Sequence, residues 1–507
     1  MLQSIRNVVS NYSLVLLRGL VLLALTPFLV RNLGMADYAA WVILQTIGYY
    51  LGFLDFGLSD AQVRQHALLA ARGDRQRLAR LHETVLTIFL VMGCGGLLVA
   101  ALLAQLPLSR WLDLPAHLAG GLAPLLGVIA VLNLAQFAEQ SLDGLYEGEQ
   151  RFDRLNLIDA GGVVLEAVLV IAVILGGGGL MALFVVYLGV AAARAIVKYA
   201  LIPALLPGRV RPRPRFDRAS WHSIRSFSLW NALNDVVTEG TAHLDKLLIP
   251  VLLTSLLVTP YSLIVLLAGL LFVIAEPLTD TFLPKFSRHA DRPGNGALRA
   301  LLDRGTLLVT LLVVPVAVVL LAHGDRLLAV WIGREYTAVS PAVLVFTVLN
   351  FAFSTWLWTA INVLLAVGRI RYVFVVSVGE VAAVLALLLA LVPHYGLAGF
   401  AAAGFVANVV FGLAFFIPAA CAASAGHWPR FMTALLVRPL LAATLAVAAA
   451  GGIRAALPEP GIASLLLQCA LSGLIAAVLL LLLALPRRQR QRYLITARTL
   501  LPGPGRS

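Results

Sequence analysis

The sequence predicts an all-α polytopic membrane protein, with about fourteen transmembrane helices arranged as two parallel six-helix repeats plus two extra C-terminal helices. Three observations support this fold class. The 507 residues are 60% hydrophobic and only 12% charged, whereas soluble proteins carry roughly 25% charged residues. Apolar runs long enough to cross a bilayer recur along the whole chain. Two short sequence patterns also recur about 220 positions apart, in the same order.

Each expected helix is an apolar run of about twenty residues, the length that crosses a bilayer. The first run is too long for the core of a signal peptide and no small-residue cleavage site follows it, so we expect it to remain as a helix. The expected spans are 10–30, 39–58, 84–104, 120–140, 157–176, 180–202, 227–252, 259–281, 305–322, 341–364, 372–391, 396–420, 438–456 and 462–485. The seventh is polar along one side, but the repeat supports it, because Tyr38 follows the first span as Tyr261 follows the seventh.

The internal repeat rests on two patterns. Val131-Leu132-Asn133 returns as Val348-Leu349-Asn350, and Gly148-x-x-Arg151-Phe152 returns as Gly368-x-x-Arg371-Tyr372. Six helices per copy is an even number, so both copies enter the membrane in the same sense. We therefore expect an N-terminal lobe over 1–206, a basic Pro/Arg-rich cytoplasmic linker over 207–226, a C-terminal lobe over 227–420, two extra helices over 421–485 and a basic cytoplasmic tail over 486–507.

Basic residues are distributed unevenly between the two sides of this arrangement. Of the 38 Lys and Arg residues, 29 fall in loops on one side, and the positive-inside rule makes that side, with both termini, cytoplasmic. The net charge of +13 therefore reflects orientation and contact with anionic lipids, and we expect no nucleic-acid partner. Loops on the opposite side are short, which leaves no room for an external catalytic domain.

Signals for cofactors and enzyme chemistry are absent from the sequence. The three cysteines lie far apart and show neither a disulfide framework nor zinc spacing. No nucleotide-binding loop or hydrolase motif occurs. We expect no cofactor, no metal and no enzymatic activity.

Ionisable side chains at bilayer depth are costly, and by default they face a bundle interior or a wet cavity. The seventh span is the clearest case, because at about 100° per residue one side of it collects polar groups. These are Asn231, Asp235, Thr238, Glu239 and, two turns on, Lys246. Such a stripe either lines a cavity or forms a polar seam that holds helices together, and we favour the cavity.

Other spans carry further candidates. Arg18 lies deep enough in the first span to meet an anionic ligand, or to pair with an acid of a neighbouring helix. Glu139 and Asp143 form an i, i+4 pair on one face of the fourth span. Arg194 and Lys198 form a similar pair near the cytoplasmic end of the sixth, where long basic side chains commonly extend to the headgroups. The remaining candidates are Asp159 in the fifth span, Asn362 in the tenth and Glu380 in the eleventh.

The repeated Gly-x-x-Arg-aromatic pattern lies just inside the predicted cytoplasmic face. Gly148 and Gly368 would permit a tight turn after a helix, Arg151 and Arg371 would hold anionic headgroups, and the aromatic ring would settle at the interface. We expect this pattern to anchor the protein in the membrane rather than to contact substrate.

Four motifs, in this order along the chain, resemble those of polysaccharide-biosynthesis transporters. They are Leu33-Gly34-Met35-Ala36-Asp37-Tyr38, Leu54-Asp55-Phe56-Gly57-Leu58, Gly148-x-x-Arg151-Phe152 and Asp245-Lys246. With the helix count and the length, they make the chain similar to the O-antigen and capsule repeat-unit flippases (Wzx type) of the multidrug/oligosaccharidyl-lipid/polysaccharide exporter superfamily. The resemblance covers nearly the whole chain.

This resemblance implies two six-helix lobes around a central cavity in the bacterial inner membrane. Through it a polyprenyl-pyrophosphate-linked oligosaccharide would pass from the cytoplasmic to the periplasmic leaflet by alternating access. Arg18 and Lys246 would contact phosphate, and the other expected cavity residues are Asn231, Thr238, Asn362, Glu139 and Asp143. The acids Asp235, Glu239, Glu380 and Asp159 are candidates for coupling to H⁺ or Na⁺. Expected partners are the lipid-linked oligosaccharide and membrane lipids, with a polysaccharide polymerase and a chain-length regulator as candidates.

Two alternatives remain open at this stage. A cation-coupled multidrug exporter of the same superfamily would share the fold, and the acids on the seventh span depart from the generally cationic cavity of the flippases. A polysaccharide polymerase or ligase is a further alternative, against which stands the lack of a long periplasmic loop.

Overall fold

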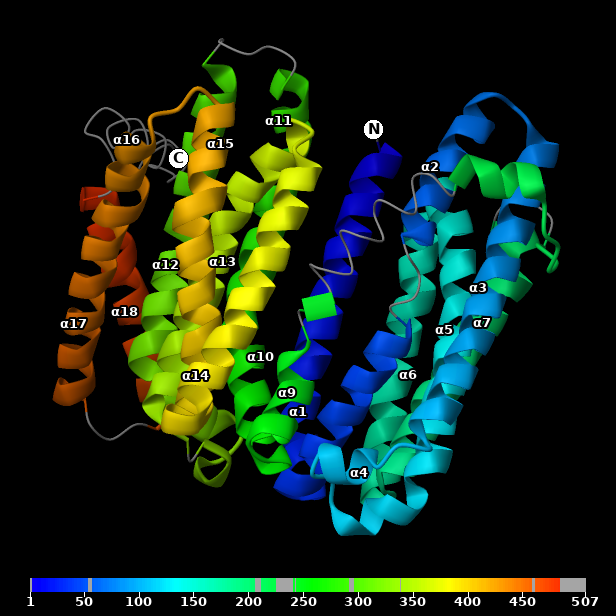
Figure 1. Ribbon diagram of the computed structural model, residues 1–507, viewed down its shortest axis with the longest axis horizontal. Coiled ribbons are helices and arrows are strands. Elements are labelled where there is room, and N and C mark those ends of the chain that lie inside the picture. The colour runs from blue at the N-terminus through cyan, green and yellow to red at the C-terminus, as the bar shows by residue number, and fades with distance from the viewer. Residues whose placement is uncertain are drawn as a thin grey trace, which may run out of the picture. The chain divides into compact units, whose positions relative to one another are not determined.

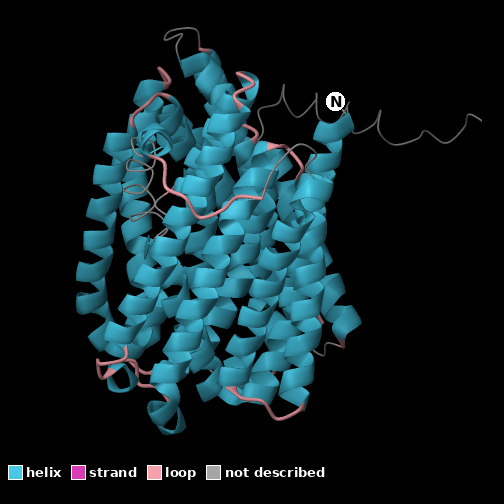
Figure 2. Cartoon of the chain, turned by 90° about the vertical axis from the view of Figure 1, so that its right-hand side faces the viewer, coloured by secondary structure: helices cyan, strands magenta, loops and turns pink. Residues whose placement is uncertain are grey.

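The computed structural model describes residues 2–52, 57–205, 211–224, 240–241, 243–290, 296–337, 339–457 and 461–483. Within these ranges every regular element is a helix and no strand occurs (Figure 2). The contacts within the chain divide it into two compact units, Met1–Thr259 and Pro260–Ser507. The predicted all-α fold class is therefore confirmed.

The first unit is built mainly from long helices that pack side by side, with shorter helices among them (Figure 1). They are α1 (Leu2–Gly52), α2 (Leu58–Ala71), α3 (Arg75–Leu103), α4 (Leu108–Trp111), α5 (Leu122–Gly148), α6 (Phe152–Leu175), α7 (Leu180–Leu205) and α9 (Asp245–Leu252). Helix α5 packs against both α3 and α7, and α1 packs against α6. The short α2 presents Leu58, Ala61 and Leu69 to a core that includes Phe89 and Phe137.

The second unit begins with α10 (Val258–Asp280) and ends with a helical pair that packs on α12 (Figure 1). Its other helices are α11 (Leu283–Ala290), α12 (Ala297–Trp331), α13 (Pro341–Ala366), α14 (Ile370–Phe411), α15 (Ile417–Ala423), α16 (Trp428–Met432), α17 (Arg438–Ala456) and α18 (Ile462–Leu483). Polar contacts join the end of α12 to this pair: Arg454 pairs with Asp325 at 2.6 Å, and His323 lies 2.9 Å from the Ser472 hydroxyl.

Eleven helices among the described residues are long and apolar enough to cross a membrane, so the chain is a multi-pass membrane protein. Two of them, Ser10–Gly52 and Ile370–Ala423, have 43 and 54 residues, or roughly 65 and 80 Å at 1.5 Å per residue, against a bilayer core of about 30 Å. Each contains a glycine with non-helical backbone, Gly34 (φ 78°) and Gly396 (φ 54°), a conformation that glycine adopts without a Cβ clash. Each therefore holds two of the expected spans.

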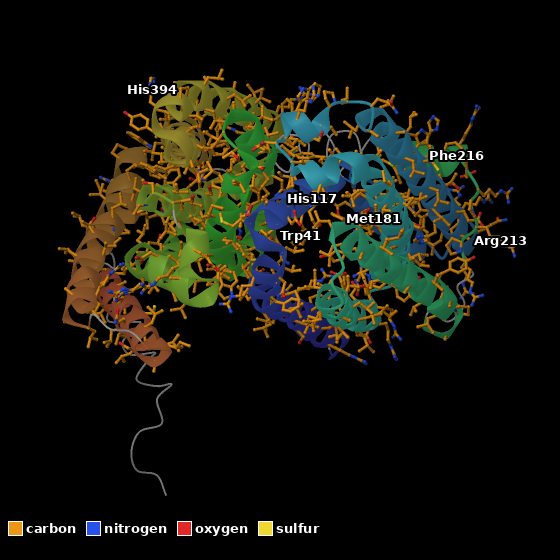
Figure 3. The ribbon with its side chains drawn as sticks, turned by 90° about the horizontal axis from the view of Figure 1, so that it is seen from below. Trp41, His117, Met181, Arg213, Phe216 and His394 are labelled. Carbon is orange, nitrogen blue, oxygen red and sulfur yellow. The ribbon has the colours of Figure 1, made fainter. Side chains whose placement is uncertain are left out.

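The seventh expected span lies mostly outside the described residues, and only its end is seen, as α9. The count of fourteen and the division into two lobes at the linker accordingly stay predictions. In the described part of that linker, residues 211–217 are not helical and residues 218–224 are. Figure 3 shows Arg213 and Phe216 projecting from the edge of the first unit, where the Phe216 side chain is 50% exposed.

The two Gly-x-x-Arg copies sit at helix ends with the same hydrogen-bond pattern. After α5, the amides of Gln150 and Arg151 donate to the carbonyls of Glu147 and Tyr146, at 2.8 and 2.9 Å. After α13, the amides of Gly368 and Arg369 donate to the carbonyls of Leu365 and Leu364, at 3.0 and 2.9 Å. Both are Schellman endings.

The left-handed residue of these endings is Gly368 (φ 76°) in the second copy but Gln150 (φ 54°) in the first. Gly368 thus makes the predicted turn, whereas the turn predicted for Gly148 is wrong. A Cβ on Gly148 would lie 2.3 Å from the ring of His66, so its smallness serves close packing between α5 and α2. By helix ending, the counterpart of Arg151 is Arg369 rather than Arg371.

Candidate functional site

Six charged side chains from four helices of the first unit form one connected group, which we call the ion cluster. Its members are Arg18 of α1, Glu139 and Asp143 of α5, Asp159 of α6, and Arg194 and Lys198 of α7. The Nζ atom of Lys198 lies 2.7 Å from Glu139, 2.6 Å from Asp143 and 2.8 Å from Asp159. Arg194 binds Glu139 at 2.9 Å, and Arg18 reaches Asp159 at 3.4 Å.

Local helix geometry explains why these groups meet. Glu139 with Asp143, and Arg194 with Lys198, are i, i+4 pairs, so each pair occupies one helix face. Because α5 packs against α7, the acidic pair faces the basic pair. Gly162 of α6 leaves space for Arg194, since a Cβ there would lie 2.4 Å from the Arg194 Cδ. On the same face, the Tyr146 hydroxyl donates to the Lys198 carbonyl at 2.8 Å.

The cluster is balanced in charge and graded in exposure. Three basic and three acidic side chains sum to zero when all are ionised. The Lys198 side chain is 1% exposed and that of Glu139 7%, whereas Asp143 is 27% and Arg18 54% exposed. Buried ions are tolerated only when they are paired and hydrogen-bonded. The cluster therefore has a closed centre at Lys198 and an accessible edge at Arg18.

The expectation that Arg194 and Lys198 extend to the headgroups is wrong for Lys198, which is fully buried. Its ammonium group has three carboxylates within 2.8 Å, so it gains more from these partners than from reaching the interface. For Arg18, the ion pair with a neighbouring helix's acid is observed, and its exposure leaves the guanidinium open to a ligand as well.

A cavity of about 280 Å³ lies beside the ion cluster. Its wall combines charged groups, amides and one aromatic ring, namely Arg18, Glu139, Asp143, Arg194, Asn133, Gln136, Gln140, Phe137 and Gly52. Amide groups both donate and accept hydrogen bonds, as sugar hydroxyls do, while the arginines can bind an anion. Of the predicted cavity residues, the structure brings Arg18, Glu139 and Asp143 to this wall, and the predicted coupling acid Asp159 directly behind it.

The repeated asparagines hold helices together in each unit. Asn133 is buried, donates to the Ile129 carbonyl at 3.0 Å, and packs so closely on α1 that a Cβ on Gly52 would lie 2.5 Å from its Oδ1. In the second unit, Asn408 donates to the Asn350 side-chain oxygen at 2.8 Å. The sequence echo therefore marks helix contacts, and in the first unit it also marks the cavity wall.

The other predicted site residues have different surroundings. Lys246 lies on α9 with its Nζ 2.9 Å from Nδ1 of His243, whose ring meets the edge of Tyr49; it is not on the cavity wall. Asn362 is buried in α13, Glu380 is half-buried in α14, and Arg371 is exposed at the start of α14. Four further predicted site residues lie outside the described residues, namely Asn231, Asp235, Thr238 and Glu239. The roles of all these residues stay predictions.

Sequence reasoning missed Gln136 and Gln140, and it did not pair α5 with α7. A signal was present, because Asn133, Gln136, Gln140 and Asp143 follow one another at spacings of three, four and three, which places them on one helix face. The acidic pair of the fourth expected span and the basic pair of the sixth have opposite charges, which was a second signal that the two spans could pack together. Neither signal says which helices pack together.

The model of a family described as "Polysaccharide biosynthesis protein" matches residues 29–341, more than half of the chain. The chain belongs to this family. The polysaccharide-biosynthesis family that the motifs indicate is thereby confirmed.

Two curated relatives match this family member over most of their length. A protein of Shigella flexneri named "Putative O-antigen transporter" is 21% identical over 403 residues, 78% of this chain and 92% of that protein. A protein of Bacillus subtilis (strain 168) named "Uncharacterized membrane protein EpsK" is 22% identical over 461 residues, 87% of each chain.

Solved structures share its fold. The lipid II flippase MurJ in an inward closed conformation has a TM-score of 0.68 at 11% identity, covering 98% of this chain and all of that one (100%). An inward-facing multidrug resistance MATE family transporter of the MOP superfamily has a TM-score of 0.66 at 13% identity, covering 80% of this chain and 95% of that one. At these identities the likeness is one of fold.

Proposed function

We propose that this protein is a flippase that moves a polyprenyl-pyrophosphate-linked oligosaccharide from the cytoplasmic to the periplasmic leaflet by alternating access. Membership of the polysaccharide biosynthesis family, the name of the Shigella relative and the fold shared with a lipid II flippase support this proposal. The observation that carries it is a cavity between helices that are long and apolar enough to cross a membrane, with an exposed Arg18, three amides and two carboxylates on its wall. Such a wall suits a ligand that is both anionic and rich in hydroxyls.

The ion cluster offers a way to couple substrate to a cation. Arg18 is the most exposed member and its contact with Asp159 is the longest, at 3.4 Å. A pyrophosphate oxygen can therefore displace Asp159 from Arg18. The remaining members, Lys198 and Arg194 with three carboxylates, then carry one uncompensated negative charge, which a proton or Na⁺ can neutralise.

By linkage, the cation and the anionic substrate affect each other's binding by the same factor. The bound cation makes the centre around Lys198 neutral again and so keeps the cluster assembled, because an unpaired charge at this depth would be costly. In this mechanism Asp159 and the more exposed Asp143 are the coupling acids, and Arg18 is the headgroup contact.

The test is rescue of surface polysaccharide in a flippase-deficient host. We expect Arg18→Gln and Asp159→Asn to lose most of the rescue at wild-type protein levels. The matched control is Arg110→Gln on α4, an exposed arginine of the same unit that is outside the cavity, and it should rescue fully. Full rescue by both Arg18→Gln and Asp159→Asn would refute the site assignment.

A cation-coupled multidrug exporter is the second candidate, favoured by the carboxylates Glu139 and Asp143 on the cavity wall, which could bind a cationic drug. Under that alternative, overexpression raises drug resistance and deletion leaves the surface glycan unchanged. The flippase proposal expects the reverse of both results.

A further inference from the structure

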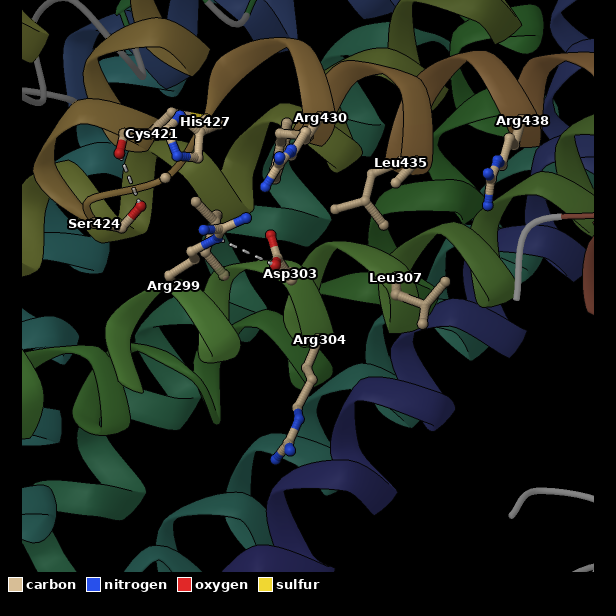
Figure 4. A pocket seen from close by; sticks show the side chains of 14 residues that line it. Arg299, Asp303, Arg304, Leu307, Cys421, Ser424, His427, Arg430, Leu435 and Arg438 are labelled. Carbon is tan, nitrogen blue, oxygen red and sulfur yellow. Dashed lines mark hydrogen bonds and ion pairs between the residues drawn. The ribbon is translucent and has the colours of Figure 1, made fainter. Parts of the chain in front are cut away.

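A second cavity, of about 220 Å³, lies in the second unit where α12, the turn after α15, and α16 meet (Figure 4). It shares no residue with the cavity of the first unit. In Figure 4, Arg299 pairs with Asp303, His427 and Arg430 lie on the other side of Arg299, and Arg438, the first residue of α17, lies at the far end of the cavity. Its wall also includes Arg304. The lining thus contains one carboxylate, four arginines and a histidine.

The arginines of this wall are poorly neutralised. Arg299 lies 3.8 Å from Asp303 in an i, i+4 contact, with the two side chains 34% and 44% exposed; exposed pairs of this kind are weak. Among the described residues, Arg304, Arg430 and Arg438 make no ion pair. The cavity therefore has a net positive wall that is open to an anion.

The floor of the same cavity is apolar. Leu302, Leu307, Phe431 and Leu435 line it, and all are buried in the core of the second unit. Guanidinium groups bind phosphate oxygens through paired N–H donors, whereas an apolar floor suits the glycerol and upper acyl atoms of a lipid. At about 30 Å³ per water molecule in the liquid, the volume accommodates a phosphate group with its glycerol.

The predicted topology places this cavity at the inner leaflet. Both segments that supply its charges, residues 284–304 and 421–438, belong to the cytoplasmic side under the positive-inside rule. Trp428 of α16 is 43% exposed beside it, as aromatic side chains often are at a membrane interface. The inner leaflet carries anionic phospholipids that attract basic segments.

We propose that this cavity is a binding site for the phosphodiester headgroup of an anionic phospholipid, held by Arg299 and Arg430 over the apolar floor. The bound lipid joins α12 to α16 and, through Arg438, to the start of α17, one of the two helices outside the repeat. A free phosphate ion offers the same oxygens but nothing for the floor, so the lipid is the favoured source of the phosphate.

The experiment is native mass spectrometry of the full-length protein titrated with phosphatidylglycerol, with phosphatidylcholine and inorganic phosphate as the comparison probes. The variant R299Q/R430Q removes two charges, and A434F fills the cavity while keeping every arginine. The matched control R72Q/R75Q removes two exposed arginines on the same predicted side of the first unit. Size-exclusion profiles confirm that each variant is folded.

We expect R299Q/R430Q to bind phosphatidylglycerol roughly tenfold or more weakly, since it loses charge-assisted guanidinium hydrogen bonds to the phosphate, each worth about a tenfold factor or more. A434F should lose binding similarly, R72Q/R75Q should match the wild type, and phosphatidylcholine should bind more weakly than phosphatidylglycerol. Wild-type affinity in R299Q/R430Q, or in A434F, would overturn the proposal. Displacement of phosphatidylglycerol by an equal concentration of inorganic phosphate would also overturn it, because the site would then take free phosphate.

Discussion

Replacing Lys198 by methionine should remove the charge that holds the ion cluster together. The side chain is 1% exposed and contacts three carboxylates at 2.6–2.8 Å. Methionine keeps the length of the aliphatic chain, so packing changes little, but Glu139, Asp143 and Asp159 then share only Arg194 and Arg18. Removing one partner of a buried ion pair typically costs about 3–5 kcal/mol.

This loss of unfolding free energy can be measured as a shift of the thermal unfolding midpoint. For a unit of 150–250 residues, each kcal/mol moves the unfolding midpoint by roughly 2–4 °C, so K198M should unfold about 6–20 °C below the wild type. The assay is thermal unfolding of the detergent-purified protein at one scan rate, followed by tryptophan fluorescence. The double variant K198M/D143N should recover part of the loss, because one uncompensated acid is gone.

The matched control is the same substitution at an exposed site. Lys285 of α11 is exposed and its ammonium lies 5.1 Å from the Phe282 ring, a contact worth about 0.5–1 kcal/mol, so K285M should shift the midpoint by only about 1–4 °C. Equal midpoints for K198M and the wild type would refute the view that Lys198 balances three buried acids.

Two further outcomes follow from single contacts. Gly162→Ala should destabilise by about 1–3 kcal/mol, because its Cβ would lie 2.4 Å from Arg194, whereas Gly161→Ala has open space and should not; equal unfolding midpoints would contradict this. Outside the spans, hydrogen bonds from Thr254 and Ser255 lower the pKa of Asp113. Because the pKa is lower in the folded state, ionised Asp113 stabilises the folded protein at pH values above its unfolded-state pKa of about 3.9. This stabilisation is lost as the pH falls through the folded-state pKa. The stability difference between the wild type and D113N should therefore be larger at pH 6 than at pH 3, and a pH-independent difference would count against it.

The helical organisation could be predicted from the sequence because it depends on local properties. Apolar runs of bilayer length recur in the structure, and the two overlong helices break at glycines close to the expected gaps, as at Gly34 between the runs 10–30 and 39–58. The residue that makes the turn in each Gly-x-x-Arg copy could not be predicted in the same way, since Gly148 and Gly368 are equivalent in sequence. In the structure, the left-handed residue of the turn is Gln150 in one copy and Gly368 in the other, because the position at which each helix ends decides which residue takes that conformation.

The charged residues of the candidate site could be predicted from the sequence only in part. Arg18, Glu139, Asp143 and Asp159 could each be predicted as membrane-embedded charges, since the cost of burying a charge is a property of the residue and its depth. Lys198 could not be assigned, because extension to the interface and burial among acids both satisfy its charge. Only the packing of α5 on α7 and of α6 beside them decides between these alternatives.

By itself the sequence determined that this is a multi-pass helical membrane protein of the polysaccharide biosynthesis family, with charged side chains at bilayer depth. Hydropathy, helix length and motif order are local or additive properties, so they can be determined from the sequence without a structure. Only the tertiary structure decided which charges neutralise one another, that a polar cavity adjoins them, and that a second, arginine-lined cavity forms where α12 meets α16. Lys198 pairs with acids that lie 39–59 positions away in the chain. These ion pairs and the two cavities depend on which helices pack together. Helix packing is determined by the sum of many contacts between segments, not by the sequence of any one segment.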